Sequence, residues 1–186
     1  MTKTRILSVA AAAALLAGTL TIGTRAAKAT DGPTDPQIVG IVLAADQIDI
    51  DYGKIALAKS KNKAVREFAQ RMVTDHSAVQ NSVIGLASKL GVTAEDSAIS
   101  GSLKSGARDI TAKLNTLKGK EFDKFYIDNE VGYHKAVTDA VAGVLIPNAQ
   151  NAELKSALEG AQPLFLKHLE HARMVQAGGE GKMSHN

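Results

Sequence analysis

Histidine and carboxylate side chains recur at inward-facing positions of four helical segments. They are Asp49, His76, the pair Glu130 and His134, and His168, each set among apolar residues at three- and four-residue spacing. A titratable group on a face that packs into a core costs several kcal/mol unless a partner satisfies it. We therefore expect these groups to meet one another inside the protein.

Two kinds of chemistry would explain such a meeting. Imidazole and carboxylate from facing helices can bind one divalent transition metal, and zinc, manganese, iron and copper all suit a site without thiolate. Two or three histidines with a carboxylate leave a coordination position for water, which metal-dependent catalysis needs. The other interpretation is a hydrogen-bond network that specifies one packing of the helices. The residue types leave both interpretations open.

The first two helices are predicted as a hairpin. Asp35, followed by proline, is typical of a helix start, and the apolar spacing continues from there to about Lys59. Asn62 is expected to cap the second helix, whose apolar stripe runs to Leu90. Gly91 stands where a helix C-cap is expected. The short connection predicts that the two helices are antiparallel neighbours.

A second hairpin comes after a long connection. The connection carries a shorter helix over residues 103–117, and the third long helix runs from about 120 to the turn at 147–148. The fourth covers 154–175, and Pro163 inside it should cause a kink. Two hairpins joined in this way are typical of a ferritin-like four-helix bundle, so we predict an all-α fold. The second and third helices are then parallel.

Counting residues from the turns predicts which side chains share a level. His76 and His134 should lie at one level, and Asp49 within roughly 5 Å of it at 1.5 Å per residue. Glu130 is one turn before His134 and shares its face. His168 is the weakest member, because the same count places it roughly 9 Å away along the axis. A ferritin-type di-iron centre needs Glu-x-x-His on two helices, a spacing that these residues do not have.

The first 29 residues have the features of a secretory signal. Lys3 and Arg5 precede an apolar run over 6–23, and a small-x-small pattern ends at Ala29, the expected cleavage point. An uncleaved membrane anchor is the alternative. We expect export to the periplasm. The expected organisation of the rest is a polar lead over 30–35, the helical domain over 36–176 and a disordered tail over 177–186.

Removal of the signal changes the charge balance. The signal holds four basic residues and no acidic one, so 22 Lys plus Arg become 18 against 19 Asp plus Glu, and the net charge goes from +3 to −1. Nothing in this balance indicates nucleic acid as a partner. A basic corner at the first hairpin could contact an anionic envelope surface, although such runs are usually solvated. Its members are Lys59, Lys61, Lys63, Arg66 and Arg71. Glu170 and His171 are expected at a solvated edge.

Four segments resemble the ferritin-like domain-of-unknown-function family 4142, which consists of exported bacterial proteins often labelled outer membrane proteins. The segments are Asp-Ile-Asp-Tyr-Gly-Lys-Ile-Ala at 49–56, the run ending in Asp-His at 65–76, the stretch at 122–134 that begins with Phe-Asp-x-x-Tyr, and Pro-Leu-x-x-x-His-Leu-x-x-Ala at 163–172. The resemblance implies the fold and export, and the family has no settled activity. Asp49 stands where the family usually has a glutamate, which is one methylene longer.

Two functions are compatible with this pattern. The first is an exported binding or envelope- and stress-associated protein with a buried histidine and carboxylate cluster. The second is a mononuclear metal-dependent enzyme of redox or peroxide chemistry. In the enzyme, His76, His134 and Asp49 would be ligands, and Glu130 would handle protons. Metal analysis distinguishes the two.

Overall fold

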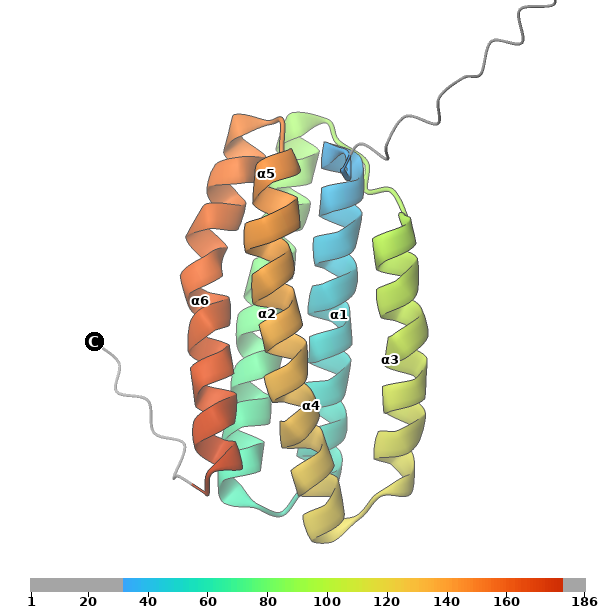
Figure 1. The fold of residues 1–186 in the computed structure, drawn as a ribbon, viewed down its shortest axis with the longest axis vertical. Helices are drawn as coiled ribbons and strands as arrows, with labels where there is room; N and C mark the ends of the chain where they lie inside the picture. The colour runs from blue at the N-terminus through green and yellow to red at the C-terminus, as the bar shows by residue number, and fades with distance from the viewer. Residues whose placement is uncertain (1–31, 179–186) are drawn as a thin grey trace, which may run out of the picture. The chain divides into compact units, whose positions relative to one another are not determined.

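The computed structural model describes residues 32–178, and the regular structure in that range is entirely helical. The all-α class predicted from the sequence is therefore confirmed. The expected signal over 1–29 and most of the expected tail lie outside the described residues. The helices are α1 (Asp35–Lys59), α2 (Lys63–Leu90), α3 (Ala98–Thr116), α4 (Gly119–Ala140), the π-helical turn η1 (Val141–Leu145), α5 (Ile146–Asn148) and α6 (Ala152–Gln176) (Figure 1).

The ends of α1 and α2 are fixed by local hydrogen bonds. α1 begins one residue earlier than predicted, because Thr34 is its N-cap and its backbone N–H donates to the Gln37 side chain at 3.1 Å. The Asp35 carboxylate instead accepts two backbone N–H groups of the loop before α6, at 2.8 and 2.9 Å. α2 is capped by Asn62 and ends at Gly91 in the left-handed conformation, as predicted.

Helix packing places the second half of the chain beside the first. α1 packs mainly against α2, and α4 mainly against α6. Contacts of α2 with α6 and of α1 with α4 connect the two pairs, and α3 lies on the outer side of α1 (Figure 1). Among residues 32–178, no helix is long and apolar enough to cross a membrane.

The loop before α3 is held against α1 by a close approach at Gly40. A Cβ on Gly40 would come within 2.0 Å of the Glu95 carbonyl oxygen. The Glu95 backbone N–H donates to the Pro36 carbonyl at 3.0 Å. Glycine is required at this position because any side chain would displace the loop. The loop therefore fixes where α3 begins, five residues before the predicted start at 103.

The apolar core of the described part consists of two clusters with a polar layer between them. One cluster contains Tyr52, Phe68 and Phe122, and the other contains Ile38 and Phe165. On α2, α4 and α6 the buried polar residues stand in sequence between the members of the two clusters; on α1, Asp46 does so and Asp49 follows Ile48 of the first cluster. The polar groups are thus enclosed by apolar side chains above and below.

Candidate metal centre

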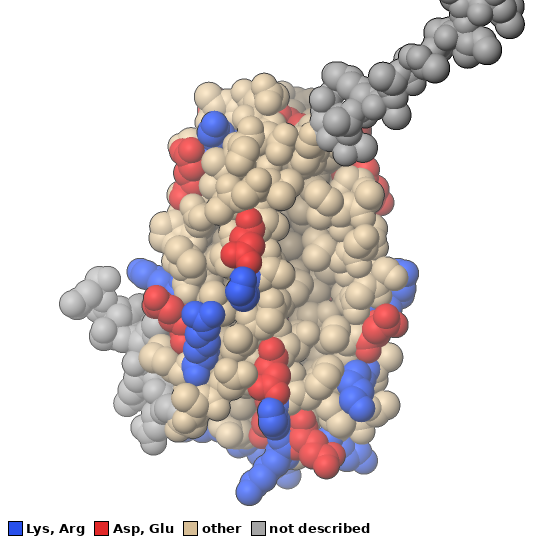
Figure 2. Space-filling view, viewed as in Figure 1, with Lys and Arg blue, Asp and Glu red and all other residues tan. Residues whose placement is uncertain are grey.

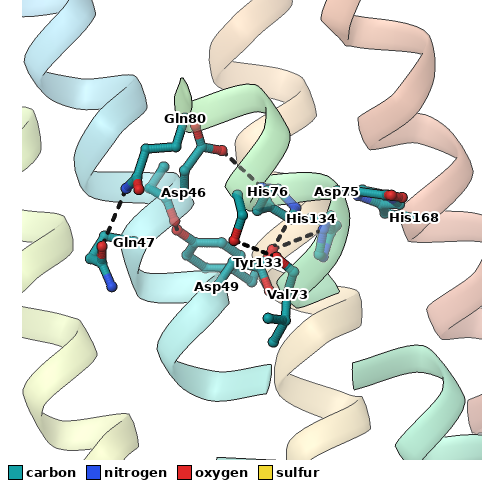
Figure 3. Close-up of polar contacts among 12 residues, drawn as sticks. Asp46, Gln47, Asp49, Val73, Asp75, His76, Gln80, Tyr133, His134 and His168 are labelled. Atoms are coloured by element: carbon teal, nitrogen blue, oxygen red, sulfur yellow. Dashed lines mark hydrogen bonds and ion pairs between the residues drawn. The ribbon is translucent and has the colours of Figure 1, made fainter. Parts of the chain in front are cut away.

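The structure brings all five predicted site residues into that polar layer. Asp49, Glu130 and His134 are 0% exposed, His168 is 1% exposed and His76 is 3% exposed. They come from α1, α2, α4 and α6, and Figure 3 shows His76 and His134 beside Asp49. Their meeting inside the helices agrees with the expectation from the apolar stripes. Whether they bind a metal stays a prediction.

Asp49 stands at the centre of the group. Its Oδ2 lies 2.9 Å from Nε2 of His76 and 3.2 Å from Nε2 of His134. The ring centroid of His168 is 5.1 Å from that of His76 and 5.4 Å from that of His134. A nitrogen from each of the three imidazoles lies within 4.8 Å of the other two, which is compact enough for one metal ion.

Each of the three histidines uses one ring nitrogen for a hydrogen bond to an oxygen acceptor. The bonds join His76 Nδ1 to Asp46 Oδ1 (2.8 Å), His134 Nδ1 to the Glu130 carbonyl (3.1 Å) and His168 Nε2 to Asp75 Oδ2 (2.9 Å). The remaining nitrogens differ: Nε2 of His76 and Nε2 of His134 face Asp49 Oδ2 at 2.9 and 3.2 Å, and Nδ1 of His168 makes no hydrogen bond within the described residues. A histidine that binds a metal almost always has its second nitrogen held in this way. The rings are therefore oriented as ligands would be.

Carboxylates beside the imidazoles add oxygen atoms that could bind a metal ion. Asp49, Glu130 and His134 form a second compact group, with Glu130 Oε2 3.4 Å from His134 Nδ1. Asp49 pairs with both histidines through Oδ2, and its Oδ1 makes no hydrogen bond in the described part of the chain; the same holds for Oε1 of Glu130. Three imidazoles with Asp49 as a fourth donor form a nitrogen-rich set without thiolate, which suits a divalent transition metal.

Burial and neighbouring charges shift the pKa values of several of these residues in opposite directions. Burial opposes ionisation of Asp49, but the neighbouring His76 and His134 hold its pKa well below the usual range. Burial also lowers the histidine pKa values, yet Asp49 and the other carboxylates raise that of His76 to about 9 and that of His134 to about 10. Burial and the Asp49 charge raise the pKa of Glu130 to about 8. A metal ion must displace protons to bind here.

His168 differs from the other two histidines. Burial and the charge on His76 lower its pKa to about 4, so its imidazole is neutral near pH 7. The Asp75 carboxylate that it contacts has a side chain 27% exposed, which places the α2–α6 side of the layer nearest to solvent. A neutral imidazole is already in the state that a metal requires.

The axial mismatch predicted for His168 was wrong. The prediction counted helical residues from residue 148 onward. Residues 149–151 instead form a turn, and α6 begins only at Ala152. The turn uses residues without adding helical rise, so His168 lies closer to the level of His134. α6 runs as one helix through Pro163, and the ring contacts place His168 with the other histidines.

The layer also contains three polar groups that were not predicted there: the buried Asp46 and His171 and the partly exposed Asp75. Asp46 is buried one turn before Asp49, a spacing that places both on one face and could have revealed it. Asp75 precedes His76 directly and contacts a different helix, for which the sequence holds no signal. His171 was expected at a solvated edge, but it is 1% exposed and meets Phe68 edge-on at 5.1 Å. The solvated-edge prediction holds for Glu170 only.

Aromatic side chains pack against the polar layer. Phe165 stacks on His76 with ring centroids 5.7 Å apart and an interplanar angle of 7°. The Tyr133 hydroxyl donates to the Ala45 carbonyl at 2.9 Å. Burial, and then the carboxylate charges, raise the pKa of Tyr126 and Tyr133 well above the ordinary value, so both phenols stay protonated.

Part of the basic corner serves the fold. Lys59 Nζ donates to two carbonyls at the end of α3, at 2.6 and 2.8 Å, and lies 5.3 Å from the Phe122 ring centroid. Arg66 donates to carbonyls at the end of α1. Lys61 and Lys63 are exposed. Figure 2 shows basic side chains gathered at the lower end of the view, where the first hairpin turns in Figure 1.

Comparison with known proteins places this chain in a family. The sequence matches the family described as "Domain of unknown function (DUF4142)" over residues 21–175. The chain belongs to the DUF4142 family. The resemblance seen in its sequence segments is thereby confirmed. No match was found among curated proteins.

A solved structure shares the fold of this DUF4142 chain. The structure is titled "CopM in the Cu(II)-bound form", and it superposes with a TM-score of 0.59 at 12% sequence identity. The match covers 78% of this chain and 97% of that one. At this identity the likeness establishes a common helical fold and carries no residue of the copper site across.

Proposed function

We propose that this DUF4142 protein binds one divalent transition metal within its polar layer. Nε2 of His76, Nε2 of His134 and Nδ1 of His168 would supply three nitrogen ligands, and Asp49 an oxygen. The observation that carries the proposal is geometric: each imidazole is held at one nitrogen by an oxygen acceptor, and the three rings bring one nitrogen each within 4.8 Å of one another beside Asp49. A network that served packing alone would be expected to pair Nδ1 of His168, which makes no hydrogen bond among the described residues.

The donor set narrows the choice of metal. Three imidazoles favour zinc, copper or iron, and a single carboxylate makes manganese the weakest of the four candidates. The fold shared with a Cu(II)-bound protein supports copper as the first ion to test. The bound ion would supply charge and, where a coordination position stays open, Lewis acidity.

The residues around the ligands each have a defined task in this proposal. Asp46 and Asp75 orient the rings of His76 and His168 through charge-assisted hydrogen bonds. The Glu130 carbonyl does the same for His134. The ring protons of His76 and His134 leave when the ion binds, so affinity rises with pH until those protons are lost.

We also propose how the helices are arranged and where the protein is located in the cell. The α1–α2 and α4–α6 pairs, with α3 in the connection between them, support a ferritin-like four-helix bundle. The secretory pattern at 1–29 supports export to the periplasm after cleavage at Ala29. N-terminal sequencing of protein from the periplasmic fraction tests the second point: we expect a start at Thr30, and a start at Met1 contradicts it.

An alternative function is a mononuclear metal-dependent enzyme with redox or peroxide chemistry. Glu130 favours it, because a buried carboxyl with a pKa of about 8 can donate or accept a proton near neutral pH. Peroxide consumption by metal-loaded protein, with Glu130→Gln beside the wild type, tests this function. Equal rates for the two proteins, or no rate above that of free metal, exclude the role of Glu130.

Metal analysis tests the main proposal. Untagged protein is freed of metal with a chelator, titrated with Cu(II) or Zn(II), desalted and analysed for metal per chain. We expect one ion per chain in the wild type. In His168→Ala, affinity should fall by more than the roughly 10–100-fold caused by loss of an outer-shell partner.

His171→Ala is the matched control, because it removes a buried histidine from the same helix outside the three-histidine group. It should keep one ion per chain even if it lowers stability. Folded wild type that retains no ion, or equal losses in both variants, would show the proposal to be wrong.

A further inference from the structure

A cavity of about 230 Å³ lies directly against the polar layer, between α1, α3 and the α4–η1 segment. Its side walls are aliphatic, with Ile41, Leu103, Val137, Val141 and Leu145 among them. Figure 2 shows a hollow on the face where α1 lies between α3 and α4, in a region with few charged side chains. The cavity is therefore a largely apolar space that adjoins the candidate metal centre.

One end of this cavity is polar. Asp46, Asp49, His76 and His134 line it there, opposite the aliphatic walls. Asp46 Oδ2 and Asp49 Oδ1 make no hydrogen bond among the described residues, whereas Asp49 Oδ2 is paired with Nε2 of both histidines. A ligand that fills the apolar part can thus place one hydrogen-bonding group against this end.

The volume limits the size of such a ligand. An apolar cavity of about 150 Å³ in a protein core stays dry and binds benzene. The space beside Asp49 is half as large again, so it fits a benzene ring with one or two small substituents. A charged head group would lose its hydration beside buried carboxylates and imidazolium rings that already pair with one another, at a cost of several kcal/mol, so we expect the ligand to be uncharged.

The walls of the cavity give it a route to the surface. Ile99 of α3 is 38% exposed and Ala136 of α4 is exposed, and both line the cavity. On the far side, Val141 and Leu145 belong to the π-helical turn η1. π-turns inside helices often occur at functional sites because they reshape the neighbouring surface.

We propose that this cavity binds a small uncharged molecule with an apolar body the size of a substituted benzene and one hydrogen-bonding head group. The body lies among the aliphatic walls, and the head group faces Asp49, His76 and His134. The site does not depend on the metal. When metal is bound, the head group lies beside its ligands.

Binding of 4-methylphenol tests the proposal, with toluene and 4-methylbenzenesulfonate as companions. The thermal unfolding midpoint and the heat of titration are measured on metal-free and metal-loaded full-length protein. We expect saturable binding of 4-methylphenol to both forms. Toluene should bind roughly 2–10-fold more weakly, the effect of one hydrogen bond. The sulfonate should not bind.

A cavity-filling variant and a matched control locate the binding. Ala140→Leu places a larger side chain in the cavity and should abolish saturable binding. Ala161→Leu makes the same change in α6, beside a separate groove between α2 and α6, and should leave binding unchanged. Ala136→Phe, at the exposed rim, replaces Ala140→Leu if that variant does not fold.

Three results would overturn the proposal: no saturable binding to wild type, undiminished binding to the filled variants, or equal binding of the sulfonate. Binding of 4-methylphenol is also measured on the metal-free protein. The cavity proposal can therefore be judged even if the protein binds no metal. Conversely, one ion per chain together with no binding of 4-methylphenol would reject the cavity proposal alone.

Discussion

Asp46 shows how a residue outside a ligand set can determine what the set does. Its carboxylate lies 2.8 Å from His76 Nδ1 and is buried with it. With one proton held at Nδ1, loss of the second proton of the imidazolium leaves the lone pair at Nε2, the atom that lies 2.9 Å from Asp49 Oδ2. The aspartate therefore selects the tautomer in which His76 can bind a metal.

Asp46→Asn should lower metal affinity roughly 10–100-fold, because the amide is a weaker acceptor and no longer fixes the ring. Asp51→Asn is the control; Asp51 is exposed on the same helix and pairs with Gln47 at 2.9 Å. A competition titration with a coloured chelator measures both. Equal affinities in the two variants would show that Asp46 has no such role.

The stability of the metal-free protein should depend on pH through the histidines. The pKa of His76 is raised from 6.5 to about 9, so its stabilising charge is fully present below pH 6.5 and is lost as pH rises through 9. His134, raised to about 10, acts in the same direction. The free energy of unfolding should therefore fall between pH 6.5 and 10.

Urea unfolding at a series of pH values measures this decline. His76→Gln carries no titrating ring and should show a shallower decline over the same range. His168 acts in the opposite direction, because its pKa is lowered to about 4. Its contribution to stability is fully present above pH 6.5 and is lost as pH falls through 4. An unchanged slope in His76→Gln would contradict the assignment of the charge.

At the scale of elements, α1 and α2 approach closely at Gly53. A Cβ there would lie 2.8 Å from Val73 Cγ2 and 3.0 Å from the Ala69 carbonyl oxygen. Gly53 is one turn after Asp49, so this contact sets the distance between Asp49 and His76. The glycine is a structural requirement of the site rather than of a turn.

Gly53→Ala should reduce the free energy of unfolding by about 1–3 kcal/mol, because the helices must separate. Gly160→Ala, in α6 with nothing within 4 Å of its added Cβ, should instead stabilise by about 0.5–1 kcal/mol. Urea unfolding distinguishes the two. Similar changes in both variants would mean that the helices do not meet as described.

Helix faces were predictable from sequence because the apolar stripe is a local property. The stripes placed Asp49, His76 and His134 inward, and the structure has all three buried. The edge of an apolar stripe, in contrast, depends on contacts with other helices. His171 is buried because Phe68 of another helix covers it, and no spacing within α6 records that contact. The turn before α6 likewise shifted the level of His168.

At the scale of the whole molecule, the polar layer divides the apolar core of the described part into two clusters. Groups that would be costly alone are held there by one another, and the imidazolium of His76 lies between Asp46 and Asp49. A buried ion pair adds little net stability over apolar packing, but loss of one partner is strongly destabilising. The layer therefore fixes the register of the helices more than it strengthens them.

Bound metal should stabilise the whole fold. At free metal of 100 times Kd, the free energy of unfolding rises by about 2.7 kcal/mol, provided that only the folded chain binds. For a domain of this size the unfolding midpoint should rise by roughly 5–10 °C. A thermal scan with Cu(II) or Zn(II), then with excess chelator, measures the rise and its reversal. A rise that persists in His168→Ala would contradict binding at this site.

The donors are divided between the two halves of the chain. Asp49 and His76 belong to the α1–α2 pair, whereas His134 and His168 belong to the α4–α6 pair. Neither helix pair holds all four proposed ligands, so we expect that a chain carrying only one pair would not retain the ion. A chain cut between α2 and α3 would keep it only while the halves remain docked. Retention of metal would thus show that both helix pairs have assembled correctly.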